Sequence, residues 1–336
     1  MMWFLLALTS MVAFASWLAT FGSRWLAHRF NVVDRPTGGR KIHTKTMPLL
    51  GGLGIGVVMF VCFSVFVQNQ QMFGFLIGLA VLLIVGVLDD RFNLSPYIRF
   101  PLYAIACLTV MFTGTTIHQV TRLTGHGGMS LGWLEFPITF VWLFGVTLTM
   151  KVLDGLDGLV TGQTVIGAGL IAALALSPAY FQPLIALLAM VVAAVYLGFL
   201  PFNLNPAKQF LGESGGTIAG FSLAFLAIVS GTKVATALMA VGLPLADISV
   251  VVMGRIFRGV SPFRGDDTHL HYKLLKAGLS QRTVVFIMWS IALLFGLIAL
   301  GLQTRGKILL LIALVGLTVL LSLFTSVMRR SRVSKI

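Results

Sequence analysis

The stretch KVLDGLDGLVTG, Lys151–Gly162, separates two strongly apolar runs of this 336-residue chain. It places a lysine and two aspartates, Asp154 and Asp157, at the expected edge of a membrane. A charged side chain at the bilayer centre costs roughly 2.5–3.5 kcal/mol on insertion scales, so charges kept near that region are usually functional. The stretch therefore indicates both a membrane fold and a polar site at one face of it.

The rest of the chain repeats this alternation of apolar runs and polar loops. Apolar residues make up 57% of the sequence and charged residues 10%, and about 18 or more consecutive apolar residues are typical of a transmembrane helix. The apolar runs lack the alternation of apolar and polar residues that is typical of transmembrane β-strands, so a β-barrel is not expected. We expect an all-α polytopic integral membrane protein, one transmembrane domain over 1–336 with about 11 transmembrane helices. Eleven apolar runs can be marked, at approximately 2–22, 49–68, 71–88, 98–117, 132–150, 158–177, 183–200, 215–231, 234–253, 283–302 and 306–327.

The basic residues predict the orientation of these helices. With the N-terminus outside, 20 of the 24 Lys and Arg residues fall on the cytoplasmic side, as the positive-inside rule requires. The chain is then a multi-pass protein of the inner cell membrane with its C-terminus in the cytoplasm. The net charge of +14 reports topology and anionic lipid contact, and no nucleic acid partner is expected because no polar domain offers a groove. The predicted cytoplasmic loops are approximately 23–48, 88–97, 151–158, 201–214 and 254–282.

Nine of the ten acidic residues fall at or near this same face. Acids contribute little to topology, so the cytoplasmic side uses carboxylates for another purpose. Asp89 and Asp90 directly follow an apolar run and suit a proton acceptor or a metal–phosphate site, although a solvated helix end is the alternative. Asp154 and Asp157 are three residues apart and share a helix face; a helix N-cap with a solvated partner is the alternative there.

Basic and amide side chains accompany these acids. The first loop supplies Arg40, Lys41 and His43, which suit either a phosphate clamp or a solvated basic loop. Asn203 and Lys208 precede a glycine-rich turn that opens the next apolar run, where backbone amides favour an anion. The fifth loop contains Arg264, His269 and His271. On a helix, two histidines at this spacing diverge by about 200° and do not form a zinc pair, whereas in a loop each can meet a phosphate or a uracil edge.

The order of these motifs resembles a known family. The patterns DxPxxxRKxH…PxxGG, LDDRFxLSP, DGLDGL, FNxxPAKxFLGES and PLxD…SPFxxDxxHLH follow one another from Asp34 to about Arg282. They are similar to those of the polyprenyl-phosphate N-acetylhexosamine-1-phosphate transferases. The resemblance implies that a polyprenyl phosphate, undecaprenyl phosphate in most bacteria, attacks the β-phosphorus of a UDP-sugar. The products are a polyprenyl-diphosphate sugar and UMP, in a first membrane step of cell-envelope polysaccharide synthesis, usually with Mg²⁺.

The resemblance also implies roles for particular residues. The pair Asp89 and Asp90 matches the acids proposed to deprotonate or position the lipid phosphate, and Asp154 and Asp157 match the DGxDG acids. We expect these four as catalytic residues, with Asp154 and Glu213 as metal ligands. Direct attack by the lipid phosphate and a covalent aspartyl intermediate both stay open. The expected substrate-binding residues are Arg40, Lys41, His43, Lys151, Asn203, Lys208, Arg264, His269 and His271.

The chain departs from the family pattern at five positions. Leu148 and Lys151 stand where the family has Asn, Glu213 stands where it has Asp, Gly216 stands where it has Ser, and Tyr272 replaces a histidine. The changes at Lys151 and Glu213 affect expected metal contacts and put the usual Mg²⁺ site in question. Because both positions change together toward opposite charges, we expect them to form an ion pair; a lysine that snorkels to the interface is the alternative.

Two other functions fit parts of this pattern. A transporter could use the carboxylates as relays, but its polar residues should occur at the midplane and at both faces, whereas here they crowd one face. A catalytically inactive relative that binds polyprenyl phosphate is the second alternative, kept open by the altered metal positions. A homodimer stays open as an assembly.

Overall fold

The computed structural model is almost entirely helical. It describes residues 2–36, 45–66, 69–121, 127–231, 234–260 and 268–333. Four of the expected substrate-binding residues lie outside the described residues: Arg40, Lys41, His43 and Arg264.

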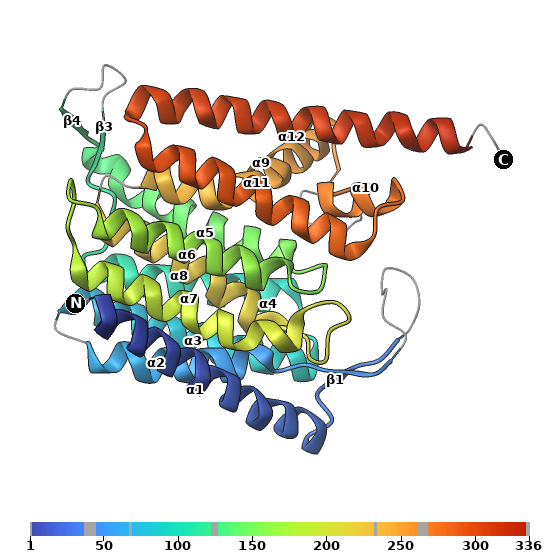
Figure 1. Ribbon diagram of the computed structural model, residues 1–336, viewed down its shortest axis with the longest axis horizontal. Helices are drawn as coiled ribbons and strands as arrows, with labels where there is room; N and C mark the ends of the chain where they lie inside the picture. Colours follow the sequence, from blue (N-terminus) through green and yellow to red (C-terminus); the bar gives the residue numbers. More distant parts are fainter. Residues whose placement is uncertain are drawn as a thin grey trace.

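Each of the eleven apolar runs corresponds to one helix, although several runs extend a few residues past its ends, so the predicted all-α bundle is confirmed (Figure 1). In the described part of the chain, eight helices are long and apolar enough to cross a membrane, and two shorter apolar helices, α2 and α4, have 15 and 17 residues. The protein is thus an integral multi-pass membrane protein. The helices that correspond to the eleven apolar runs are α1 (Met2–Arg29), α2 (Gly51–Val65), α3 (Gln70–Phe92), α4 (Pro96–Phe112), α5 (Glu135–Leu153), α6 (Leu159–Leu176), α7 (Pro183–Asn203), α8 (Gly212–Val229), α9 (Val234–Phe257), α11 (Gln281–Gly301) and α12 (Thr304–Val333).

Short elements mark the two ends of the bundle. At one end, with the start of α1, lies an antiparallel hairpin of β3 and β4 (Figure 1). At the other end lie the β1–β2 ribbon, the helix α10 and the end of α12. The polar segments of the sequence therefore share the second end. The bounds are β1 (Val33–Asp34), β2 (Met47–Pro48), β3 (Gln119–Thr121), β4 (Gly128–Ser130), the 3-10 helix η1 (Gly132–Leu134) and α10 (Leu270–Lys276).

Local sequence fixes where α3 ends and α4 begins. Asn93 closes α3 with a φ of 51°, a left-handed conformation that asparagine tolerates better than most residues. The Ser95 side chain then accepts a hydrogen bond from the Tyr97 amide at 3.3 Å, and Pro96 takes the first helical position, where a missing N–H costs nothing. These signals leave Asp89 and Asp90 in the last turn of α3, at the polar end of the bundle.

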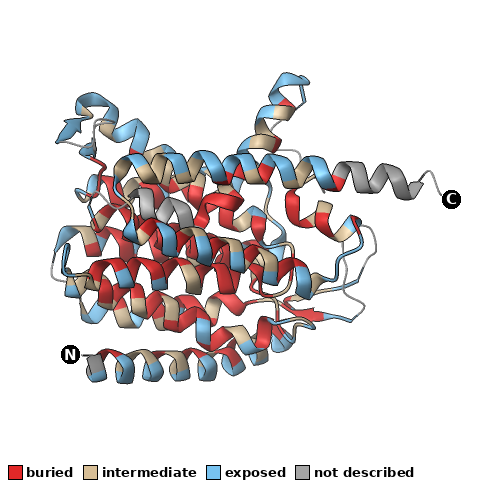
Figure 2. Cartoon of the chain, turned by 45° about the horizontal axis from the view of Figure 1, so that its top comes forward, coloured by how far each residue is buried: buried red, intermediate tan, exposed pale blue. Residues whose placement is uncertain are grey.

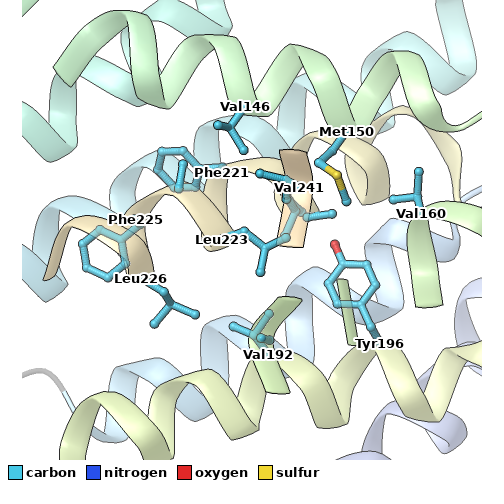
Figure 3. Close-up of a cluster of buried hydrophobic side chains, with 14 of the residues drawn as sticks. Val146, Met150, Val160, Val192, Tyr196, Phe221, Leu223, Phe225, Leu226 and Val241 are labelled. Carbon is cyan, nitrogen blue, oxygen red and sulfur yellow. The ribbon is translucent and has the colours of Figure 1, made fainter. Parts of the chain in front are cut away.

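Helix α8 forms the centre of the bundle. It packs against α2, α3, α5, α6, α7 and α9, and Figure 2 shows the inner helices largely buried while α1 is exposed along one side. Its Phe221 and Phe225 stack on Phe75, with ring centres 5.3 and 4.5 Å apart. Figure 3 shows Val146, Val192 and Tyr196 converging on the same helix. Because its surroundings are packed, the first turn of α8 has a fixed position.

Two glycines allow α2 and α3 to approach that first turn closely. A Cβ atom on Gly52 would lie closer than 3.0 Å to the Gly215 backbone, and one on Gly86 would be as close to the Ser214 backbone. The Tyr196 hydroxyl also donates to the Gly215 carbonyl at 2.7 Å. These contacts hold the residues around Glu213 against the ends of three other helices.

Replacing Gly86 with Ala is expected to destabilise the protein by about 1–3 kcal/mol, the usual cost of forcing extra atoms into a packed interior. Gly145→Ala is the matched control, because a Cβ there meets nothing within 4 Å. Thermal unfolding in detergent should give a lower midpoint for Gly86→Ala and an unchanged or higher one for Gly145→Ala. Equal midpoints for the two variants would contradict this account of the packing.

Candidate active site

A cavity of about 1040 Å³ lies at the polar end of the bundle. It is bounded by the β1–β2 ribbon, the end of α3, the Lys151–Gly162 stretch and the segment from Asn203 to Glu213. A space of this size suits a small-molecule substrate. Seven of the predicted site residues line it: Asp90, Lys151, Asp154, Asp157, Asn203, Lys208 and Glu213.

The predicted ion pair between Lys151 and Glu213 is confirmed. Lys151 Nζ lies 2.7 Å from Glu213 Oε1, and only 16% and 11% of the two side chains are exposed. The Tyr103 hydroxyl donates to the same carboxylate oxygen. The ammonium also lies 5.6 Å from the ring centre of Phe100 and 5.9 Å from that of Tyr103, within the range of cation–π attraction. Carboxylate and rings together fix the position of the lysine.

Arg99 joins this pair to Asp89. Its Nη1 lies 3.0 Å from Asp89 Oδ2 and 3.6 Å from Glu213 Oε1. Asp89 is therefore held by an arginine behind the cavity wall. Neither Arg99 nor Tyr103 is among the site residues predicted from the sequence. The usable signal was the charge of Arg99 near the start of an apolar run, because such charges are costly unless partnered.

Asp89 Oδ1 is buried without a hydrogen-bond partner among the described residues, but Asp89 does not line the cavity, whereas Asp90 does. Asp90 Oδ1 accepts a hydrogen bond from the Glu213 amide at 2.9 Å. Its Oδ2 is buried and has no hydrogen-bond partner among the described residues. Gly212 leaves room for it, since a Cβ there would lie 2.5 Å from Oδ2. A buried carboxylate oxygen without a donor is costly, so this position favours a cation or a proton.

Asp157 is held by neutral donors. Its Oδ2 accepts from Asn205 Nδ2 at 2.9 Å and from the Ala207 amide at 3.1 Å. Asn205 Nδ2 also donates to Gln281 Oε1 at 2.9 Å. Asp157 thus ties the Lys151–Gly162 stretch to the α7–α8 loop and, through Asn205, to the start of α11.

Asn203 ties together the same two segments. Its Oδ1 accepts from the Gly158 amide at 3.1 Å and from Thr161 Oγ1 at 2.6 Å, and its Nδ2 donates to the Gln209 carbonyl at 3.2 Å. The side chain is buried. These bonds give Asn203 a role in positioning the cavity wall, and its expected contact with substrate stays a prediction.

Asp154 lines the cavity, where the residue as a whole is exposed while its carboxyl group is closely surrounded by protein atoms. Desolvation by burial, followed by repulsion from the Glu213 and Asp157 carboxylates, raises the pKa of Asp154 to about 8. Without a bound cation the group therefore keeps its proton near neutral pH.

This raised pKa predicts a pH dependence of stability. The unfolded chain releases the Asp154 proton near its ordinary pKa of 3.8, but the folded protein holds it up to about pH 8. The stabilisation is thus fully present below about pH 4 and is lost as pH rises through 8. In EDTA, the thermal midpoint in detergent should fall more steeply between pH 6 and 9 for the wild type than for Asp154→Asn. Parallel curves would show that Asp154 titrates normally.

The two histidines lie beside the cavity, not on its wall. His269 Nδ1 lies 2.9 Å from Asp247 Oδ2, and Asp247 Oδ1 accepts from the Leu270 amide at 2.9 Å. The histidine rings stack with centres 5.9 Å apart. His271 lies in α10, not in the loop that its sequence favoured, and burial lowers its pKa to about 4.

Helix α10 nevertheless supports the cavity. A Cβ atom on Gly155 would lie 3.0 Å from His271 Nε2 and would overlap the Tyr272 hydroxyl. Tyr272, the residue that replaces a family histidine, itself lines the cavity. The DGLDG segment therefore requires glycine at position 155 to pack on α10.

The donor set fits Mg²⁺ only with help from substrate. Among the described residues, no three His, Cys, Asp or Glu side chains are grouped to hold a metal ion alone. Mg²⁺ usually takes one or two carboxylates together with substrate phosphates and water. Asp90, with its unpartnered Oδ2, and the accessible Asp154 meet that requirement. Glu213 is already engaged by Lys151 and Tyr103, and its expected role as a metal ligand stays a prediction.

Comparison with known proteins places this cavity in a family. The sequence model of glycosyl transferase family 4 matches residues 72–231. The chain is 33% identical over 289 residues to a "Probable undecaprenyl-phosphate N-acetylglucosaminyl 1-phosphate transferase" of Bacillus subtilis, covering 83% of this chain and 79% of the relative. It is 29% identical over 292 residues to an undecaprenyl-phosphate alpha-N-acetylglucosaminyl 1-phosphate transferase of Yersinia pestis, with the same coverage. It is 30% identical over 287 residues to a phospho-N-acetylmuramoyl-pentapeptide-transferase of Halalkalibacterium halodurans, covering 79% of this chain and 86% of the relative. The chain therefore belongs to glycosyl transferase family 4 and is a phospho-sugar transferase of the polyprenyl-phosphate type that its motifs resemble.

Proposed function

We propose that the protein transfers an N-acetylhexosamine-1-phosphate from a UDP-sugar to undecaprenyl phosphate or another polyprenyl phosphate, and releases UMP. The observation that carries this proposal is one cavity in which acids from four separate segments of the chain meet Lys151 at the edge of the bundle. Two of the relatives are named for transfer of N-acetylglucosamine 1-phosphate to undecaprenyl phosphate. The reaction is a first membrane step in making a cell-envelope polysaccharide.

This reaction requires the protein to position the two substrates and to stabilise the negative charge on their phosphates. An oxygen of the lipid phosphate forms a bond to the sugar-linked phosphorus, and the bond from that phosphorus to the bridging oxygen of UMP breaks. Phosphoryl transfer leaves little covalent work to the protein. Asp90 lies where it can position the lipid phosphate or accept its proton. Asp89 holds Arg99, which also contacts Glu213. Asp157 holds the Lys151–Gly162 stretch in place.

Mg²⁺ is the cofactor that we propose, held by Asp90 and Asp154 and by substrate phosphates. When bound, it would neutralise phosphate charge during transfer. Lys208 is exposed at the cavity and suits a phosphate contact. The basic residues Arg40, Lys41, His43 and Arg264 stay candidates for binding the nucleotide or its phosphates.

We also propose that the cavity faces the cytoplasm of the cell, with the N-terminus outside and the C-terminus inside. The 20-to-4 split of basic residues supports this orientation, since the rule concerns positive charge near the cytoplasmic ends of helices. The segments that line the cavity, among them β1 and the end of α3, lie at the end of the bundle that also holds α10 and the end of α12 (Figure 1). A reporter fused after Ile336 should be active only in the cytoplasm, and periplasmic activity would reverse the orientation.

The direct test uses purified protein, undecaprenyl phosphate and a panel of UDP-sugars, scored by UMP release. At least one UDP-N-acetylhexosamine should release UMP and leave its sugar in the lipid extract. Membrane vesicles with radiolabelled UDP-sugar separate this function from transport. Label that crosses intact, with no UMP from any sugar nucleotide, would refute the transferase.

A further inference from the structure

Carboxylate side chains outnumber basic side chains in the cavity and in the wall behind it. Two of the carboxylates share the Arg99 guanidinium, those of Asp89 and Glu213. A UDP-sugar and a lipid phosphate would add further negative charge to the same space. Like charges brought together in a partly dehydrated site repel strongly, so the substrates need a positive charge at a fixed place. The six carboxylates of the cavity and of the wall behind it are those of Asp34, Asp89, Asp90, Asp154, Asp157 and Glu213.

Lys151 is the cation best placed for this task. Of the three lysines that line the cavity, Lys45 and Lys208 are exposed, whereas the Lys151 side chain is only 16% exposed. Its ammonium is held at 2.7 Å by Glu213 and lies near the rings of Phe100 and Tyr103. The lysine is therefore oriented before any substrate binds.

Lys151 also retains hydrogen-bonding capacity. An ammonium group has three N–H donors. Within the described ranges, Glu213 Oε1 is the only acceptor within hydrogen-bonding distance of Lys151 Nζ. Because Lys151 forms part of the cavity wall, donors are left to meet an anion there.

We propose that Lys151 is a fixed cation of the active site that donates hydrogen bonds to the substrate phosphates, and that Glu213 is a positioning residue for this lysine and not a metal ligand. The inference rests on the proposed function and names a residue that handles charge in it. As the bond from the sugar-linked phosphorus to the UMP oxygen breaks, negative charge grows on the leaving phosphate. A donor already in place stabilises that charge without reorganisation.

The first arm of the test removes the lysine charge. Lys151→Met is expected to lower kcat for UMP release by about 10²–10³-fold, as removal of one preorganised donor does. It should also weaken binding of UMP, measured by equilibrium dialysis, by about tenfold, which corresponds to about 1.4 kcal/mol. Lys276→Met is the control, because Lys276 is exposed on α10 and does not line the cavity. Unchanged UMP binding in Lys151→Met would overturn the proposal.

The second arm separates function from folding. Lys151→Met leaves Glu213 without its ammonium partner and can destabilise the protein, so the double variant Lys151→Met/Glu213→Gln removes both charges together. We expect the double variant to regain the wild-type thermal midpoint and to stay as slow as Lys151→Met. Recovery of most of the wild-type kcat would overturn the proposal, because the lysine would then serve only to neutralise Glu213.

The third arm tests the role of Glu213, in part by measuring metal binding, which does not depend on enzyme activity. Glu213→Gln keeps an acceptor for the lysine, so kcat should fall by no more than about tenfold while KM changes little. Binding of Mn²⁺, followed by electron paramagnetic resonance, should be unchanged in Glu213→Gln and weakened in Asp154→Asn. Mn²⁺ binding at least tenfold weaker in Glu213→Gln would make Glu213 a ligand and refute its positioning role. If the wild type released UMP from no UDP-sugar, the proposed function would fail, and the UMP and Mn²⁺ arms would still decide this inference.

Discussion

Asp90→Asn is expected to lower the kcat of UMP release by about 10³-fold, within the range that a positioned acid or base contributes. Asparagine keeps an oxygen to accept the Glu213 amide, so the local fold should survive. The substitution replaces the unpartnered Oδ2 and its negative charge, which the lipid phosphate or a cation would meet. Activity should be measured with undecaprenyl phosphate at saturating UDP-sugar, together with the thermal midpoint in detergent.

Asp89→Asn is the informative comparison. Asp89 is held by Arg99 and does not line the cavity, so its loss should slow transfer by releasing the arginine and should lower stability as well. Mn²⁺ binding should weaken in Asp90→Asn and stay unchanged in Asp89→Asn. If both variants kept most of their UMP release, neither carboxylate would be the base or an essential group for placing phosphate.

The helices could be predicted because hydropathy dominates in this sequence. Each apolar run became a helix, since a chain in lipid must satisfy its backbone internally. The Lys151–Glu213 contact could be predicted for a different reason. Two positions that carry opposite charges in a low-dielectric region have few stable arrangements other than meeting each other. For the helices and for the ion pair alike, one strong physical requirement allows few alternative structures.

The rest of the site depends on packing that no local pattern encodes. Tyr103 and Phe100 lie in an apolar run whose residues could face lipid or core equally well, and Glu213 is more than a hundred positions away in the sequence. The contact arises because Gly86 lets α3 approach the first turn of α8. The position of His271 was likewise set by the start of α10 at Leu270.

Arg99 is the residue whose loss should cost the most stability. Its Nη1 lies 3.0 Å from Asp89 Oδ2 and 3.6 Å from Glu213 Oε1. The exposed fraction of the side chain is 19% for Arg99, 9% for Asp89 and 11% for Glu213. Arg99→Met would leave both carboxylates short of positive charge. Breaking a buried pair by removing one partner costs about 3–5 kcal/mol. Because the Arg99 side chain is partly exposed and therefore screened by water, we expect a loss of unfolding free energy at the lower end of this range, about 3 kcal/mol.

A double-mutant cycle tests whether this loss comes from the ion pair. Asp89→Asn/Arg99→Met removes the carboxylate charge that loses its partner in Arg99→Met, while Glu213 keeps Lys151. The double variant should therefore be more stable than the sum of the single losses implies, with a coupling of about 1–3 kcal/mol. Arg91→Met is the control, because Arg91 is exposed at the end of α3 and such surface changes stay within about 0.5 kcal/mol. Unfolding by urea in mild detergent gives all four free energies. If the losses of unfolding free energy in Asp89→Asn and Arg99→Met were strictly additive, the two side chains would not stabilise each other. Any effect of Asp89 on the active site would then not depend on its contact with Arg99.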